Sequence, residues 1–168
     1  RGYTNIGEAL RDTPGFAAPD SSPIGAEPAT LGVSQTFVDF FGLGSQRTLT
    51  LVNGRRFVSS NTVSGSGGGA SPGSQVDLNT IPAGLVERVE TVAIGGAPVY
   101  GSDAIAGTVN VILKDDFEGA EATVQYGVSD RGDAESHTFR GLIGANSEDG
   151  RGNAVVAFEH NEQKGLRL

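Results

Sequence analysis

The chain has 168 residues and a formal net charge of −8, from 20 acidic and 12 basic side chains. This balance argues against a nucleic-acid partner, because binding a phosphate backbone requires a basic face. The sequence has no Cys, which excludes disulfides and thiolate metal sites. No apolar run approaches the roughly 20 residues of a membrane helix, and 26 Gly with 7 Pro predict many turns and loops.

The N-terminal part predicts one short helix followed by a long loop. Asn5-Ile6-Gly7-Glu8 has the pattern of a capping box, in which the first and fourth residues exchange hydrogen bonds at a helix N-terminus. Thr13-Pro14-Gly15 should end that helix. Residues 16–35 are rich in Pro, Ala, Ser and Gly without periodicity, so we expect an irregular loop, and loops of this length are usually functional or disordered.

The next stretch predicts a hairpin and a second loop. Asn53-Gly54 is a strong two-residue turn signal, so Leu49–Val52 should pair with Arg55–Val58. Ser59–Gln75 is a Gly/Ser segment that lacks the Lys-Ser/Thr ending of a phosphate-binding loop, and we interpret it as flexible. Val76–Leu78 should form a brief strand before a helical turn at Ile81-Pro82.

The segment Ile81–Leu113 predicts two strands joined by a helical connection. Val89–Ile94 and Thr108–Leu113 are rich in β-branched residues and are typical of strands. Between them a short helix should run from Ser102 or Asp103 through Ala106, closed by Gly107 in a left-handed conformation. This order predicts a βαβ-like unit or a split version of it. It contains no catalytic group.

Three segments near the C-terminus predict antiparallel strands: Gly119–Ser129, Ser136–Ala145 and Asn153–His160. In each, small or apolar residues alternate with polar ones. Strands of about ten residues with this alternation, joined by short turns, carry the weak signature of a transmembrane β-barrel. An ordinary antiparallel meander would alternate in the same way.

The sequence offers no constellation for catalysis or metal binding. His137 and His160 have no neighbouring carboxylate or Cys cluster, so we interpret them as surface or lumen side chains. A hydrolase would need a base near Ser102-Asp103, and neither His is placed for that role. We therefore expect no enzyme, no cofactor and no metal, and we interpret Arg55-Arg56 as a solvated hairpin turn.

Four motifs in fixed order carry a family resemblance. Together they resemble the plug domain of TonB-dependent outer-membrane receptors over roughly Thr4–Lys114, with the residues from Phe117 onward looking like the first barrel strands. The motifs are Leu10-Arg11-Asp12-Thr13-Pro14-Gly15; Thr48-Leu49-Thr50-Leu51-Val52-Asn53-Gly54-Arg55-Arg56; Ile81-Pro82 with Glu87-Arg88-Val89-Glu90; and Val99-Tyr100-Gly101-Ser102-Asp103-Ala104-Ile105-Ala106-Gly107-Thr108-Val109-Asn110-Val111-Ile112.

This resemblance implies an α+β fold: a small mixed β-sheet with short helices and long loops over 1–116, then antiparallel strands from the start of a transmembrane β-barrel over 117–168. The implied function is the gate of an active transporter in the outer membrane of Gram-negative bacteria. The plug would sit in the lumen of a barrel of about 22 strands, accessible from the periplasm. The ligand would be scarce, such as a ferric siderophore, cobalamin or an oligosaccharide. TonB would supply energy through a box upstream of Arg1.

The resemblance also implies two groups of site residues. Two loops, Ala17–Gln35 and Ser59–Gln75, match the family's outward-facing ligand loops. Contacts between plug and barrel are expected at Arg88, Glu90 and Phe41, the last standing where the family commonly has an arginine. The candidate ligand-contacting residues are Ser22, Ile24, Glu27, Ser60, Asn61, Ser64, Ser66 and Ser71.

An alternative function is a soluble ligand-binding or adhesive β-rich module. The chain opens on Arg1-Gly2-Tyr3-Thr4 without an initiator Met, from which we expect an excised segment of a longer protein. Strands from an incomplete barrel would have open edges. We expect them to be disordered, packed against the plug, or paired between copies through self-association.

Overall fold

A computed structural model describes residues 6–16, 35–60, 75–93, 96–128 and 135–163. The chain divides into two compact units, each considered by itself. The mixed-sheet unit comprises Asn5–Thr80 and Glu87–Leu113, and the strand unit comprises Arg1–Thr4, Ile81–Val86 and Lys114–Leu168.

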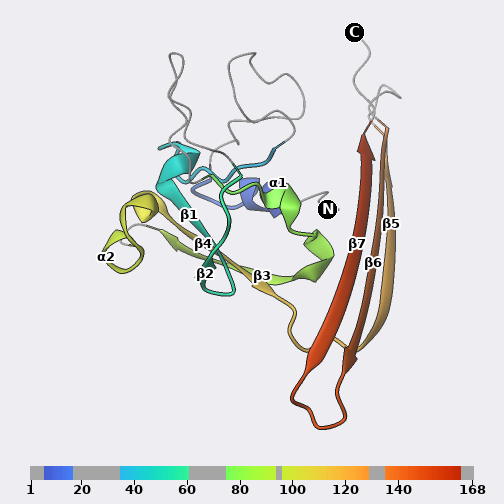
Figure 1. The fold of residues 1–168 in the computed structure, drawn as a ribbon. Helices are drawn as coiled ribbons and strands as arrows, with labels where there is room; N and C mark the ends of the chain where they lie inside the picture. The colour runs from blue at the N-terminus through green and yellow to red at the C-terminus, as the bar shows by residue number, and fades with distance from the viewer. Residues whose placement is uncertain (1–5, 17–34, 61–74, 94–95, 129–134, 164–168) are drawn as a thin grey trace. The chain divides into compact units, whose positions relative to one another are not determined.

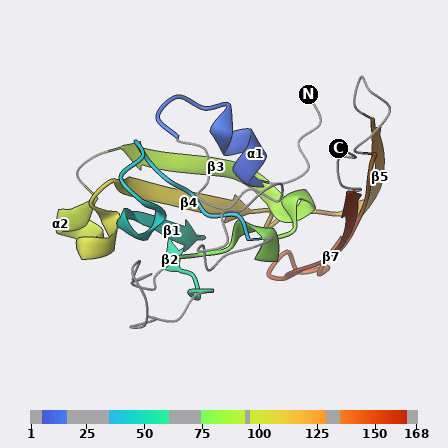
Figure 2. The same ribbon diagram turned by 90° about the horizontal axis from the view of Figure 1, so that it is seen from above.

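The mixed-sheet unit is built on four strands in the order β2-β1-β4-β3. These are β1 (Thr48–Val52), β2 (Arg55–Arg56), β3 (Val86–Ala93, which begins in the strand unit) and β4 (Gly107–Leu113). β1 pairs with β2 in antiparallel and with β4 in parallel fashion. Figure 2 shows β1, β4 and β3 side by side in this sheet. The predicted small mixed sheet with short helices is confirmed.

Burial explains why β4 lies inside the sheet. Val109 and Val111 are both 0% exposed, and their branched side chains suit a pleated strand with neighbours on both sides. Leu49 and Leu51 of β1 are buried as well, in one cluster with Ala104. The predicted strand at Thr108–Leu113 is confirmed, beginning one residue earlier.

Helical elements are short throughout. The predicted N-terminal helix is α1 (Ile6–Arg11), which buries Ile6 and Leu10. The predicted capping pair of Asn5 with the Glu8 side chain lies outside the described residues. The others are α2 (Ala97–Tyr100) and four single-turn 3-10 helices: η1 (Ser45–Arg47), η2 (Leu78–Thr80), η3 (Ala83–Leu85) and η4 (Ser102–Ala104).

The connection between β3 and β4 differs from the prediction. Gly107 does not close a helix in a left-handed conformation; it begins β4, and the positive φ of 94° belongs to Gly101. A Cβ on Gly107 would lie 2.9 Å from the carbonyl oxygen of Val92, and Asn110 Nδ2 lies 3.5 Å from Glu90 Oε2. The start of β4 therefore lies beside the end of β3, so these neighbours run antiparallel. The parallel strands of a βαβ unit are instead β1 and β4.

Two further local predictions are wrong in part. Val76–Leu78 is not a strand, because the N–H of Asp77 donates to the Ser60 hydroxyl, the carbonyl of Asp77 accepts the N–H of Thr80, and Leu78 begins η2. The hairpin at Asn53-Gly54 forms with positive φ at both residues, as a type I′ turn requires. Its second strand ends at Arg56 rather than at Val58.

The strand unit holds a three-stranded antiparallel sheet in the order β5-β6-β7, drawn in Figure 1 from gold to red. Its strands are β5 (Gly119–Gly127), β6 (Ser136–Asn146) and β7 (Asn153–Gln163). All three predicted strands are present. They are paired with one another rather than disordered.

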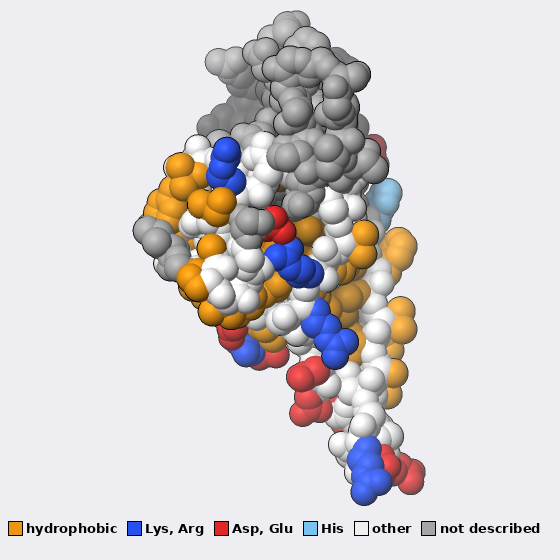
Figure 3. Space-filling model, turned by 60° about the vertical axis from the view of Figure 1, so that its left-hand side comes forward, with side chains coloured by type: hydrophobic (Ala, Val, Ile, Leu, Met, Phe, Trp, Pro, Cys, Tyr) orange, Lys and Arg blue, Asp and Glu red, His pale blue; other side chains and the backbone are white. Residues whose placement is uncertain are grey.

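The two faces of this sheet differ in polarity. One face exposes apolar side chains, visible along the sheet in Figure 3, whereas charged residues gather at the turn between β6 and β7. The opposite face carries Arg140 and Glu159, which form an ion pair. No helix among the described residues is both long and apolar enough to span a membrane. The exposed apolar residues are Val124, Tyr126, Val128, Phe139, Ile143, Val156 and Phe158.

Candidate functional site

Asp77 lies at the base of both predicted ligand loops. Its carboxylate Oδ1 accepts the backbone N–H of Thr36 at 2.9 Å and that of Asn79 at 3.0 Å. Thr36 follows the segment 17–34, and the carbonyl of Thr36 in turn accepts the N–H of Leu78 at 2.9 Å. The Asp77 side chain is buried. A buried carboxylate is stable only when its lone pairs are satisfied, so this pair of amides fixes the chain where the first loop ends.

Ser60 fixes the second loop against the same aspartate. Its hydroxyl accepts the backbone N–H of Asp77 at 2.9 Å, and its own N–H donates to the carbonyl of Gln75 at 2.8 Å. Gln75 is anchored in turn, because its side-chain amide donates to the Ser45 hydroxyl at 2.6 Å. The two ends of the segment 61–74 are therefore held side by side. We call Thr36, Ser60, Gln75 and Asp77 the loop base.

The other end of the first loop is fixed by aromatic residues. Phe16 and Phe40 form an isolated antiparallel bridge with ring centroids 4.2 Å apart. The N–H of Phe41 donates to the carbonyl of Gly15 at 2.7 Å. Both loops thus start and end on ordered, hydrogen-bonded backbone.

Of the eight predicted ligand-contacting residues, the structure describes one. Ser60 belongs to the loop base, where its hydroxyl is engaged by Asp77. The other seven lie outside the described residues: Ser22, Ile24, Glu27, Asn61, Ser64, Ser66 and Ser71. Thr36, Gln75 and Asp77 were not among the predicted ligand-contacting residues, and Asp77 lies inside the segment that the sequence predicted as a brief strand.

The structure brings two of the three predicted barrel-contact residues together. Arg88 Nε lies 2.9 Å from Glu90 Oε1, and its Nη1 lies 2.8 Å from Glu87 Oε1. The hydrogen bond to Glu90 raises the pKa of the Arg88 guanidinium above its ordinary value. Phe41 instead packs its ring on Phe40 at 4.8 Å and adopts a positive φ of 58°. The Arg88 side chain is 53% exposed, so it remains accessible from solvent.

Arg56 is exposed, as expected for a solvated turn residue, but its guanidinium also makes specific contacts. Its Nη1 lies 2.5 Å from Asp103 Oδ2, and its Nη2 donates to the carbonyl of Tyr100 at 2.5 Å. The hairpin is further pinned to β4, since the N–H of Gly54 donates to Asn110 Oδ1 at 2.9 Å. These contacts tie the β1–β2 hairpin to the helical connection between β3 and β4.

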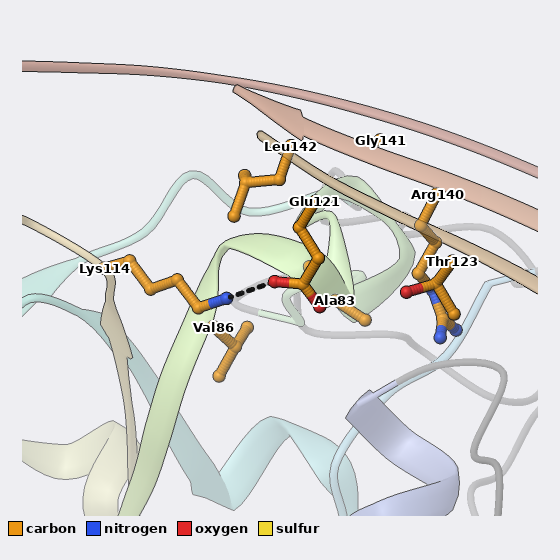
Figure 4. A pocket seen from close by; sticks show the side chains of 9 residues that line it. Ala83, Val86, Lys114, Glu121, Thr123, Arg140, Gly141 and Leu142 are labelled. Atoms are coloured by element: carbon orange, nitrogen blue, oxygen red, sulfur yellow. Dashed lines mark ion pairs between the residues drawn. The ribbon is translucent and has the colours of Figure 1, made fainter. Parts of the chain in front are cut away.

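The strand unit contains a polar cavity of about 200 Å³. Figure 4 shows Lys114, Glu121, Thr123 and Arg140 around it, with Lys114 Nζ 3.8 Å from Glu121 Oε2. Glu159 lies beside Arg140, with its Oε1 3.3 Å from Arg140 Nε.

The second oxygen of Glu159 binds the backbone. Its Oε2 accepts the N–H of Ala83 in η3 at 2.9 Å. These residues are 76 positions apart, and nothing in the local sequence pattern around either one predicts the contact. The Arg140 and Glu159 side chains are 16% and 19% exposed, so the pair is shielded from most of the solvent.

The polar residues assembled here do not form a metal site. Among the described residues, no group of three or more His, Cys, Asp or Glu side chains could hold a metal ion. His137 and His160 lie on the neighbouring strands β6 and β7, where His160 is paired with Phe139 and His137 with Glu162.

Comparison with known proteins identifies the family. Residues 1–108 match the family described as the TonB-dependent Receptor Plug Domain. This range includes the whole loop base, the Arg56 contacts and β3. The match covers more than half of the chain, and its members are parts of transporters, not enzymes.

Curated relatives agree with this match. The chain is 32% identical over 125 residues to the "Iron-regulated outer membrane virulence protein" of two Vibrio cholerae serotype O1 strains, covering 74% of this chain and 17% of each relative. It is 36% identical over 101 residues to the "Vitamin B12 transporter BtuB" of Vibrio vulnificus, covering 59% of this chain and 15% of the relative. The chain thus corresponds to less than a fifth of these relatives' length. It belongs to the plug-domain family of the TonB-dependent outer-membrane receptors.

Proposed function

We propose that this chain is the plug, with the first wall strands, of an active importer of a scarce ligand, driven by TonB. The observation that carries the proposal is the family match over residues 1–108. One relative is named as iron-regulated and another as a vitamin B12 transporter. A ferric siderophore or cobalamin is therefore the first class of ligand to test, and an oligosaccharide the second.

We assign residues 1–116 to the plug and 117–168 to the barrel wall. The polarity of the β5–β7 sheet supports this assignment. Val124 and Val156 are 77% and 71% exposed on its apolar face, whereas the other face carries the ion pair of Arg140 with Glu159. A barrel wall needs one apolar face for lipid and one polar face for the lumen.

Ligand sensing is assigned to the two loops that leave the loop base. Contacts from Ser22, Ile24 and Glu27 in one loop and from Asn61, Ser64, Ser66 and Ser71 in the other would order these segments on the ligand. Such ordering costs conformational entropy, and fixed loop ends reduce that cost. Asp77 and Ser60 supply fixed ends for both loops.

Arg88 is assigned to the contact between plug and barrel. Its guanidinium is exposed and currently bound by Glu87 and Glu90, so a wall carboxylate could exchange with either of them at little cost. Phe41, where the family commonly has an arginine, would contribute an apolar contact instead. TonB would bind a segment preceding Arg1.

The test is uptake by the full-length receptor in cells with and without TonB, using radiolabelled cobalamin and radiolabelled ferric siderophores as probes. Uptake of one probe that requires both the receptor and TonB is the expected result. Accumulation of no probe, or accumulation that persists without TonB, would contradict the proposal. Specific ligand binding by the 168-residue chain alone would instead favour the soluble-module alternative.

A further inference from the structure

The segment Ile81–Val86 precedes most of β3 in sequence but belongs to the strand unit. It lies within the plug family's match of residues 1–108, yet its contacts are with wall strands. The N–H of Ala83 donates to Glu159 Oε2 of β7 at 2.9 Å. A residue of the wall thus binds the backbone of the plug directly.

Glu159 is well placed for this contact. Its other oxygen lies 3.3 Å from Arg140 Nε on the adjacent strand, where the register pairs the two residues. The carboxylate thus lies between two partners, with one oxygen beside the guanidinium of Arg140 and the other on the N–H of Ala83. Hydrogen bonds to a charged acceptor are about twice as strong as neutral ones.

A second contact closes the segment. The N–H of Lys114, where the chain returns from β4, donates to the carbonyl of Leu85 at 2.8 Å. The residues before and after Glu87–Leu113 are therefore hydrogen-bonded to each other within the strand unit. Lys114 also reaches Glu121 of β5 at 3.8 Å, which adds a weaker link to the same sheet.

Apolar packing alone does not account for the attachment. All three residues of η3 are partly exposed, and a polar cavity separates part of the segment from β5 and β6, as Figure 4 shows for Ala83 and Val86. Of the contacts described for this segment, the hydrogen bond from Ala83 to Glu159 reaches β7 directly and has a charged acceptor, so it is the contact whose removal should loosen the segment most.

We propose that Glu159 is a positioning residue that anchors Ile81–Val86 to the barrel wall, and that this segment stays on the wall during a transport cycle. The part of the plug that moves is then limited to residues on either side of the anchor. The claim that the segment stays on the wall during transport rests on the proposed function. The anchoring of the segment by Glu159 can be tested without transport.

The first experiment is hydrogen exchange of the full-length receptor without ligand, read on peptides covering residues 81–86. Glu159→Ala should speed exchange there about tenfold, because the Ala83 N–H loses its charged acceptor. Glu159→Gln keeps an acceptor oxygen and should restore most of the protection. Glu162→Ala removes a carboxylate from the opposite face of β7, where Glu162 is paired with His137, and should leave exchange unchanged. Equal exchange in the wild-type protein and Glu159→Ala would overturn the anchor.

The second experiment follows the segment during uptake. Ala83→Cys in the full-length receptor is exposed to a thiol reagent in cells, before and after adding a probe that the receptor imports. Labelling should not increase with transport, but should increase when Glu159→Ala is added. An increase in the Ala83→Cys receptor alone would overturn the claim that the segment stays on the wall. Absence of any uptake would count against the proposed function and leave the exchange result to decide the anchor.

Discussion

The carboxylate of Asp77 accepts the backbone N–H of Thr36 over 2.9 Å, although the two residues are 41 positions apart. The same carboxylate accepts the N–H of Asn79, and the backbone N–H of Asp77 donates to the Ser60 hydroxyl, so one buried residue joins the ends of two long segments. The loops proposed to sense ligand are therefore not independent of each other. The end of the first segment contacts the Asp77 carboxylate and the start of the second contacts its backbone N–H, so both meet at this one residue.

Replacing Asp77 tests this joint. Asp77→Ala leaves the buried N–H of Thr36 and the partly buried N–H of Asn79 without their acceptor, and we expect the free energy of unfolding to fall by about 2 kcal/mol. Asp77→Asn keeps an acceptor oxygen of the same shape and should cost clearly less. Urea unfolding of the chain, followed by circular dichroism, measures both. A loss equally large for the two variants would show that the charge, and not the acceptor, is what matters.

The two adjacent arginines of the hairpin should behave differently. Arg56 binds Asp103 and the carbonyl of Tyr100, whereas Arg55 is exposed on the same short strand. We expect Arg56→Ala to lower the free energy of unfolding by about 1 kcal/mol, since its ion pair is only partly shielded. Arg55→Ala should change it by less than about 0.5 kcal/mol. Similar losses for both variants in urea unfolding would refute the role given to Arg56.

Gly107 marks a close approach between strands. A Cβ there would lie 2.9 Å from the carbonyl oxygen of Val92 and 3.2 Å from the Phe40 ring, whereas one on Gly84 would meet nothing within 4 Å. Overpacking of this kind costs roughly 1 to 3 kcal/mol. Thermal unfolding should show a lower midpoint for Gly107→Ala, and little change or a small gain for Gly84→Ala. A neutral Gly107→Ala would mean that β3 and β4 can separate freely at this point.

The turn between β6 and β7 should respond to acid. The Ser147 hydroxyl donates to the Asp149 carboxylate at 2.5 Å and lowers the pKa of Asp149 below its ordinary 3.8, helped by the N–H of Arg151. The folded turn therefore binds its proton less readily than the unfolded chain. Its contribution to stability is present above pH 3.8 and is lost as pH falls through the lowered pKa. Amide exchange at residues 147–152 should rise with acid in this range, and Asp149→Asn should remove that dependence.

Local patterns predicted the elements but not the contacts between them. Alternation predicted β5, β6 and β7 closely, because apolar and polar residues alternate along each strand over about ten residues. The hairpin at Asn53 was predictable for a similar reason, as its turn chemistry is contained in two residues. The predicted brief strand at Val76 failed because tertiary hydrogen bonds to Asp77 outweighed a weak local preference.

The site residues also differ in whether their contacts are local or join distant parts of the chain. Arg88 and Glu90 were named from the family resemblance, and their contact with each other is a local one, between residues two positions apart on β3. Glu159 and Ala83 were missed because they are 76 positions apart and one partner is a backbone amide. Any residue other than proline has such an amide, so the amino-acid type at position 83 gives no signal for the contact. The family resemblance predicted the architecture, whereas the anchor and the loop base emerged only from the folded chain.

The most direct test of the central claim is the conductance of the full-length receptor in planar lipid bilayers, compared with a receptor lacking residues 5–113. If these residues are the stopper of an outer-membrane pore, the intact receptor should remain closed to ions and the deleted one should conduct steadily. Equal conductance of the two proteins, with both shown to be folded and inserted, would contradict the claim that this chain closes a transport path.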